Sequence, residues 1–422
     1  MQNINPILII VGIPVAIAIL LNPFLGLISI ITLIPQALIQ AVSGTLFGIF
    51  TMATPIKLIG ALSFISVLIK NTLEKKELHF FKQKQIVWSA LFLLWIVVSG
   101  LTQPGYSTRE NFTVYISCAI FGFLILSLVN NLQRYRILLW AGIISISVVS
   151  IKGILDYIFF ESIAVEAKNN FLRVTGESFD PNYFAIMLLP FLGVTFYNIF
   201  AERNKLLKTV SLLICFLVVI ALIVTFSRGG IIGFFVMLLT ASYKSKKKIK
   251  AIFLLLLTIL ILINVMPAKV WERFEKTKIE GESGEEAIAS TKRRFLLAKA
   301  AWQIFLNNPL IGVGVGNFYY MSRLYQPIRP GRAHSTYLEI MAELGLIGII
   351  LFFILVFLSL RSLKKIASQN TLIGTYAKGL FIGLIGFLVA ATFLHAQQEK
   401  VFWMIIFLSA ALEKITISQI KE

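Results

Sequence analysis

The residues of this sequence that are best suited to chemistry are His334 and a few arginines, which stand in polar segments between long apolar runs. Histidine has a pKa near neutrality and can take a proton from a hydroxyl group. Arginine stays protonated and presents a rigid fork of donors that matches phosphate oxygens. Together these residue types predict a site that handles a hydroxyl group and an anion at a membrane surface.

His334 follows Arg332 and precedes an apolar run that contains Gly345 and Gly348. At about 100° per residue, an α-helix would return both glycines to nearly the same face as His334. We therefore expect the three residues to share one stripe, along which the glycines let another helix pack closely. A structural histidine at a helix start is the alternative. The neighbouring Arg332 favours a base, because positive charge nearby keeps an imidazole neutral.

Arg228 lies between two apolar runs, in the segment Ser227-Arg228-Gly229-Gly230. An arginine costs about 2.5–3.5 kcal/mol at the centre of a bilayer, so its presence there needs a reason. One interpretation is a turn arginine whose head group reaches water. We favour a phosphate ligand, because Gly229 and Gly230 at the start of the next helix would also present backbone N–H groups to an anion.

Further candidates lie in two other polar segments. A basic run on an amphipathic helix holds Arg293 and Arg294, and such a run is often only a solvated face. An anion ligand is the alternative, and from the residues alone it could be either Arg294 or Arg293. In the other segment, Asp180 or Asn182 is expected to cap the helix that follows. The alternative role for these two residues, with Arg173 and Arg332, is substrate binding.

Composition places the chain in a membrane. Of its 422 residues, 58% are hydrophobic and 14% are charged, and most apolar runs are about as long as a membrane helix. The net charge of +19 comes from basic clusters between these runs, which is the positive-inside pattern. We expect contact with anionic membrane lipid and no nucleic-acid partner. The sequence has no clustered Cys and His ligands and no nucleotide-binding motif, so we expect no metal and no cofactor.

The hydropathy pattern predicts an all-α, polytopic membrane bundle of 12–13 transmembrane helices with one large outer, periplasmic loop. We divide it into a helix bundle over 1–266, a periplasmic loop with amphipathic helices over 267–333, and C-terminal membrane helices over 334–422. Basic residues outnumber acidic ones in the loop, which suits an anionic ligand. The first segment lacks a basic start, so we expect no removable signal peptide, and it either forms a broken span or turns back at Asn22-Pro23.

Three segments carry a resemblance to the O-antigen ligase superfamily, which also includes polysaccharide polymerases and protein-directed oligosaccharyltransferases. The resemblance covers roughly residues 170–360. One departure is Ala298, where an aromatic residue is frequent, although Trp302 stands one turn later. The segments are Ser227-Arg228-Gly229-Gly230, Arg294 with Asn308-Pro309-Leu310-Ile311-Gly312-Val313-Gly314, and His334-Ser335 through Glu343-Leu344-Gly345-Leu346-Ile347-Gly348.

This resemblance implies a metal-independent, multi-pass glycosyltransferase of the cytoplasmic (inner) membrane, with its active site on the outer face. It would transfer a glycan from an undecaprenyl-diphosphate carrier to an acceptor hydroxyl. Arg228 and Arg294 would hold the diphosphate, and His334 would activate the acceptor. The acceptor is either the lipid A core, as for a ligase, or a growing polysaccharide, as for a repeat-unit polymerase. A protein acceptor is disfavoured, and the alternative from another class is a membrane transporter of a small anion.

Overall fold

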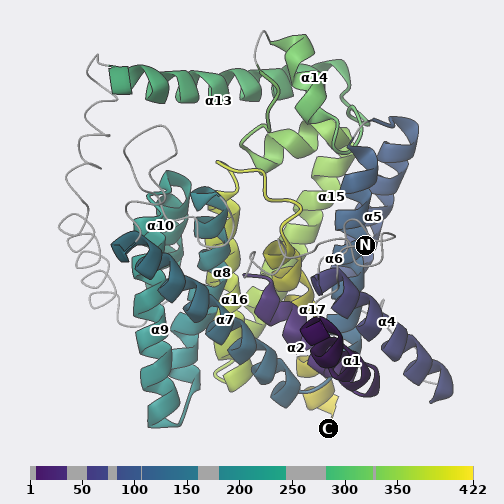
Figure 1. Cartoon of the computed structure of the whole chain (residues 1–422), viewed down its shortest axis with the longest axis vertical. Helices are drawn as coiled ribbons and strands as arrows, with labels where there is room; N and C mark the ends of the chain where they lie inside the picture. Colours follow the sequence, from purple (N-terminus) through teal and green to yellow (C-terminus); the bar gives the residue numbers. More distant parts are fainter. Residues whose placement is uncertain are drawn as a thin grey trace.

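The computed structural model describes residues 6–35, 55–74, 83–105, 107–159, 180–243, 282–326 and 329–421, and these contain helices and no strand. Most helices run along one direction, whereas α13 lies across one end of the bundle (Figure 1). The helices are α1 (Pro6–Leu21), α2 (Pro23–Leu33), α4 (Pro55–Leu73), α5 (Lys84–Thr102), α6 (Thr108–Leu128), α7 (Leu132–Phe159), α8 (Pro181–Ala201), α9 (Lys205–Val224), α10 (Arg228–Tyr243), α13 (Glu282–Asn307), α14 (Phe318–Tyr325), α15 (Thr336–Ala367), α16 (Leu372–Ala390) and α17 (Lys400–Lys421).

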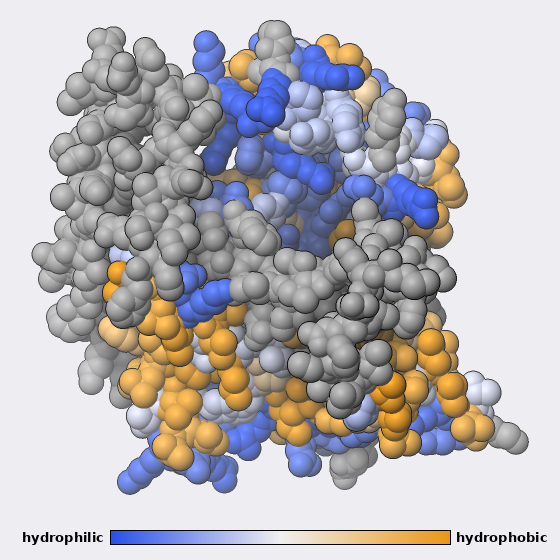
Figure 2. Space-filling view, in the orientation of Figure 1, coloured by the Kyte–Doolittle hydropathy of each residue, from blue (hydrophilic) through white to orange (hydrophobic). Residues whose placement is uncertain are grey.

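Within the described ranges, nine helices are long and apolar enough to cross a membrane, and three shorter apolar helices accompany them. Figure 2 shows the corresponding surface, on which a hydrophobic belt lies between a hydrophilic upper region and a hydrophilic lower rim. These observations confirm the predicted all-α polytopic bundle. The predicted total of 12–13 spans includes one near 249–266, which lies outside the described residues.

Basic residues of the short loops and of the adjoining helix ends gather at one end of the bundle. The helices α8 and α15 run toward an end that is rich in lysine and arginine, and α9 starts there with Lys205. The opposite end holds the first residues of α8, α10, α15 and α17. The basic residues at the first end include Arg134, Arg136, Arg203, Lys205, Lys208, Arg361, Lys364 and Lys365.

Close helix packing in the centre depends on glycine. A Cβ atom added to Gly193 of α8 would lie 2.6 Å from the carbonyl oxygen of Gly379 in α16. One added to Gly233 of α10 would lie 2.6 Å from the carbonyl oxygen of Gly386. Without side chains at these contacts, the backbones of α8, α10 and α16 approach closely, as is common where membrane helices associate.

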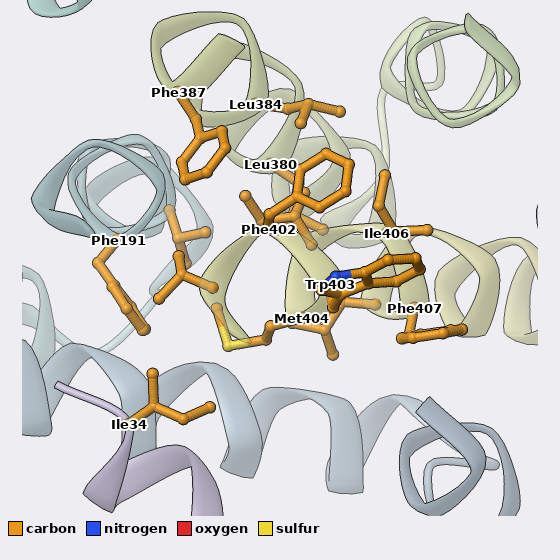
Figure 3. Packing of buried hydrophobic residues seen from close by; sticks show 14 of the residues in the cluster. Ile34, Phe191, Leu380, Leu384, Phe387, Phe402, Trp403, Met404, Ile406 and Phe407 are labelled. Carbon is orange, nitrogen blue, oxygen red and sulfur yellow. The ribbon is translucent and has the colours of Figure 1, made fainter. Parts of the chain in front are cut away.

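Aromatic residues of α17 fill the space beside this contact. Phe402 projects toward α16, where Phe387 stacks on it with ring centroids 5.7 Å apart (Figure 3). Trp403 points the other way, toward Phe92 of α5, with ring centroids 6.1 Å apart. Trp403 is fully buried and its indole N–H donates to the carbonyl of Gln397 at 3.1 Å. The packed start of α17 therefore also fixes the loop 391–399, which leads into the functional site.

Near the N-terminus, the chain breaks at the predicted residues. Asn22 separates α1 from α2, and its side chain accepts a hydrogen bond from the N–H of Phe24 at 3.3 Å. Pro23 occupies the first position of α2, where a missing N–H costs nothing.

Helix α15 is interrupted at Gly345, which has φ 65° and ψ −164°. A Cβ atom there would lie 2.3 Å from the carbonyl oxygen of Leu310, so the glycine makes room for a loop and not for another helix. His334 stands before the first residue of α15 with φ 50°. The prediction that His334, Gly345 and Gly348 share one helical stripe is therefore wrong, because the helical rotation neither begins at His334 nor continues through Gly345.

The loop 308–317 supplies partners for the backbone groups that this break exposes. The N–H groups of Val313 and Gly314 donate to the carbonyls of Ala342 and Glu343, each at 3.0 Å. On the other side of the break, the N–H of Leu346 donates to a carbonyl of the same loop at 2.7 Å. These hydrogen bonds attach the loop that follows α13 to α15, in the part of the chain that follows His334.

We expect Gly345→Ala to destabilise the protein by about 1–3 kcal/mol through its backbone conformation alone, and further through the contact with Leu310. The measurement is the thermal unfolding of the detergent-solubilised protein. Gly60→Ala is the matched control, because a Cβ atom at Gly60 of α4 would meet only Ile30 at an ordinary 3.9 Å. Equal melting temperatures for the two variants would contradict the role given to Gly345.

Candidate active site

A cavity of about 350 Å³ lies at the end of the bundle opposite the basic end. In Figure 2 the upper half of the molecule has a hollow lined by hydrophilic residues. Five segments line the cavity: the start of α8, the helices α13 and α14, the stretch before α15, and the loop 391–399. The lining residues are Asp180, Tyr183, Arg293, Tyr319, Arg329, Pro330, Gly331, Arg332, His334, Leu394 and His395.

His334 reaches this cavity from a strained turn. Its φ of 50° lies in the left-handed region, which histidine enters more readily than most residues. Among the described residues, only His334 and Phe226 combine a side chain with positive φ, and Phe226 lies two positions before Arg228. Strained backbone of this kind is common at functional sites. Here it occurs in the segment before Arg228 and at His334, both of which sequence analysis singled out.

The imidazole of His334 is held neutral. Burial lowers its pKa to about 4, with further contributions from Arg294, His395 and Arg293 and a weaker opposing one from Glu339. A neutral imidazole can accept a proton at pH 7, as a general base must. We expected the arginines to produce this state; they contribute, but burial contributes more.

Glu339 fixes the turn that carries His334. Its carboxylate is fully buried and pairs with Arg332, Oε1 to Nη1, at 3.1 Å. It also accepts from the N–H of Ala333 at 3.0 Å and from the side-chain amide of Gln397 at 3.3 Å. Residues on both sides of the cavity are therefore tied to one carboxylate.

Arg332 has a structural partner as well as a place in the cavity wall. Burial acts to lower the pKa of Arg332, but Glu339 and Glu343 outweigh it, so this pKa lies above its ordinary value. The guanidinium therefore carries its charge permanently, and part of that charge balances Glu339.

The two loop arginines both lie near His334. Arg293 lines the cavity and donates to the carbonyl of Pro330 at 2.9 Å. Arg294 is half-buried and lowers the pKa of His334 more than Arg293 does. Apolar residues on the same side of α13 anchor both, because Leu297, Ala301 and Ile304 pack against Phe318 and Ala333.

Arg228 occupies the first position of α10, beside the cavity but not in its lining. Its side chain is exposed, and no hydrogen bond or ion pair joins it to another residue of the described ranges. A Cβ atom on Gly229 would meet Phe393 at 3.0 Å, so this turn packs against the loop that carries His395. Arg228 is therefore a cation available at the edge of the site.

The two glycines after Arg228 serve packing more than anion binding. The N–H of Gly230 donates to the hydroxyl of Ser227 at 3.3 Å, so the expectation that it is free for an anion is wrong. A Cβ atom on Gly230 would lie 2.6 Å from that of Ala185 in α8. Ser227 in turn donates to the Asn182 side chain at 3.0 Å, which joins the starts of α8 and α10.

The capping prediction is confirmed for Asp180, whose carboxylate accepts from the N–H groups of Asn182 at 2.6 Å and Tyr183 at 3.4 Å. Asp180 also lines the cavity, whereas Asn182 does not. Arg173 lies outside the described residues.

Sequence analysis missed His395, Tyr183 and Glu339. His395 is one of three histidines in the chain and stands in a polar segment between two apolar runs, which is a usable signal. Glu339 is a carboxylate inside an apolar run, where an uncompensated charge is costly. Tyr183 offers no local signal.

The comparisons with known proteins agree with this geometry. The O-antigen ligase family model matches residues 213–353, a range that holds Arg228, Arg293, Arg294, Arg332 and His334. The match confirms the family resemblance over residues 213–353. The matched range includes both strained turns and the break of α15 at Gly345.

The chain is also similar to the teichuronic acid biosynthesis protein TuaE of Bacillus subtilis (strain 168). The two are 22% identical over 356 residues, which cover 77% of this chain and 70% of that protein. The similarity therefore extends beyond the residues that the family model matches.

We expect Glu339→Ala to lower the free energy of unfolding by about 1–3 kcal/mol for each buried group that it leaves without a hydrogen-bond partner. Those partners are the guanidinium of Arg332, the N–H of Ala333 and the amide of Gln397. Thermal unfolding measures the effect. Glu110→Ala, an exposed change in α6, should stay within about 0.5 kcal/mol of wild type. An unchanged melting temperature in Glu339→Ala would show that this network does not hold the turn.

Proposed function

We propose that the protein is a membrane glycosyltransferase that moves a glycan from an undecaprenyl-diphosphate carrier to a hydroxyl group of a glycolipid or glycan acceptor. The observation that carries the proposal is the cavity that joins a neutral histidine, His334, to the arginines Arg293, Arg329 and Arg332. A base and a set of fixed cations are what transfer from a diphosphate to a hydroxyl requires.

In this reaction the acceptor oxygen attacks the anomeric carbon of the donor sugar. The bond from that carbon to the diphosphate oxygen breaks, and its electron pair stays with the diphosphate. His334 takes the proton of the attacking hydroxyl. The arginines stabilise the charge that grows on the leaving diphosphate, so we propose that the transfer needs no metal ion.

We assign the diphosphate to Arg228 and Arg294, with Arg293 as an additional ligand. Arg228 is exposed beside the cavity, and α13 brings the two loop arginines close to His334. For Arg332 we propose a smaller part in binding, because its charge balances Glu339. Substrate binding by Arg173 rests on the sequence alone.

The basic residues of the short loops support an orientation. Such residues collect on the cytoplasmic side of membrane proteins, whereas long loops escape this bias. In this bundle the short basic loops, such as the one with Arg203 and Lys205, lie at the end away from the cavity. We therefore propose that the cavity opens on the outer, periplasmic face of the cytoplasmic membrane.

Transfer to a lipid A core and transfer to a growing polysaccharide share this chemistry. The relative from Bacillus subtilis is named for teichuronic acid biosynthesis and not for a lipid A core. We therefore favour a growing polysaccharide as the acceptor, which would make the protein a repeat-unit polymerase.

Removal of either proposed diphosphate ligand should slow the transfer. We expect Arg228→Ala and Arg294→Ala each to lower the rate by about 10²–10³-fold, the usual effect of losing one stabilising donor. Lysine should restore little at either position, because the donor fork is lost. The assay uses the purified protein with an undecaprenyl-diphosphate-linked glycan. Lys299→Ala, an exposed change on the same helix as Arg294, should stay within about twofold. Full activity in Arg228→Ala would remove that residue from the diphosphate site.

Loss of the base should lower turnover without loss of carrier binding. We expect His334→Ala to reduce the transfer rate by about 10²–10⁴-fold and to bind undecaprenyl diphosphate as wild type does. In wild type, the His334-dependent rate should be level from pH 8 to about pH 5 and fall toward pH 4, because acid protonates the base only near its lowered pKa of about 4.

A fall in rate centred on pH 6.5 would contradict this lowered pKa, and near-normal turnover in His334→Ala would leave the histidine a structural role. Uptake of a small anion by vesicles that hold the protein, without any glycan transfer, would support the transporter instead.

A further inference from the structure

A second histidine shares the cavity with His334. His395 lines it from the loop 391–399, and the hydroxyl of Tyr183 lies 2.9 Å from its Nδ1 atom. The same hydroxyl contacts Nε2 and lies 3.1 Å from the carbonyl of His395, while the two rings meet edge to face with centroids 5.3 Å apart. The phenol has one proton and donates it to one acceptor at a time, while its oxygen can also accept from the N–H of the ring. Tyr183 therefore orients the imidazole of His395 where it lines the cavity.

Backbone contacts fix His395 relative to His334. Thr336, two residues after His334, donates through its hydroxyl to the carbonyl of Leu394 at 2.7 Å and accepts from the N–H of Ala396 at 2.8 Å. The residues on either side of His395 are therefore held by one side chain. The N–H of Thr336 also donates to the same part of the chain at 2.9 Å. The spacing of the two histidines is thus set by the short side chain and the backbone of Thr336.

Two kinds of residue line the cavity. Arg293 and Arg329 have guanidinium groups that suit a diphosphate. Asp180, Tyr183 and His395 present a carboxylate, a phenol and an imidazole, with Arg332 close enough to affect the pKa of His395. A carboxylate repels an anion, but it accepts from a hydroxyl group, and phenol and imidazole can pair with one as well. These three residues therefore suit sugar hydroxyls.

We propose that His395, held by Tyr183, binds a hydroxyl group of the acceptor glycan beside the hydroxyl that His334 deprotonates. This inference rests on the proposed transferase function and gives His395 a role in substrate binding. Burial lowers the pKa of His395, and Arg332 adds to this, against the opposing effects of Glu339 and Asp180. A neutral imidazole has one N–H and one lone pair, which match a hydroxyl that both donates and accepts.

The test compares His395→Leu with His395→Gln in the purified full-length protein. The acceptor is the free glycan released by mild acid from the envelope polysaccharide of the host, and the donor is the undecaprenyl-diphosphate-linked repeat unit. We expect His395→Leu to raise the KM for the acceptor about tenfold, as loss of a hydrogen bond to substrate does, with kcat changed less and the KM for the donor unchanged. Glutamine should recover part of the loss, and Tyr183→Phe should raise the acceptor KM by a smaller factor.

Tyr337→Phe is the matched control. Its phenol donates to the carbonyl of Leu388 at 2.7 Å, away from the residues that line the cavity, so the variant loses a similar bond for structural reasons only. Its acceptor KM should equal that of wild type. An unchanged acceptor KM in His395→Leu would overturn the inference, as would an equal rise in the donor KM or a rise in Tyr337→Phe of the same size.

A failure of the proposed function would be recognised by a different result. If wild type transfers no glycan, the transferase proposal fails, and binding of the released glycan by calorimetry still tests His395. Weaker binding to His395→Leu than to wild type would then support a sugar-hydroxyl site, and equal binding would refute it.

Discussion

The carboxylate of Glu339 is the constraint on which the site depends. It is fully buried in the first turn of a membrane helix, where an unpaired charge is unfavourable by several kcal/mol. Its partners come from the turn before α15 and, through Gln397, from the loop before α17. Satisfying one charge therefore brings together the two segments that carry His334 and His395.

The interruption of α15 at Gly345 extends this arrangement to the arginines. Backbone groups exposed in a membrane need protein partners, since lipid tails supply none. The loop 308–317 provides them, and the indole N–H of Trp95 satisfies the carbonyl of Leu344 at 2.9 Å. The stability of α15 at its break therefore depends on this loop. Because it continues directly from α13, the same contacts set how far Arg293 and Arg294 lie from His334.

The sequence was sufficient for the features that depend on local chemistry, such as the apolar spans, the Asp180 cap and the break at Asn22-Pro23. It was misleading at Gly345, because a glycine that permits close approach and a glycine that adopts positive φ look alike in a sequence. The pairing of Tyr183 with His395 joins residues far apart in the chain. Such a pair has no spacing signal and emerges only when α8 and the loop before α17 pack together.

The helix ends at the site support the proposed placing of donor and acceptor. The N-terminus of a helix carries partial positive charge, and α8, α10 and α15 all begin at this end. Asp180 offsets that charge at α8, and Glu339 does so at α15. The first turn of α10 has no acidic residue and begins with Arg228 instead. Among these three helix starts the positive potential is least compensated at α10, which supports placing the diphosphate there and the acceptor glycan on the side of Asp180 and His395.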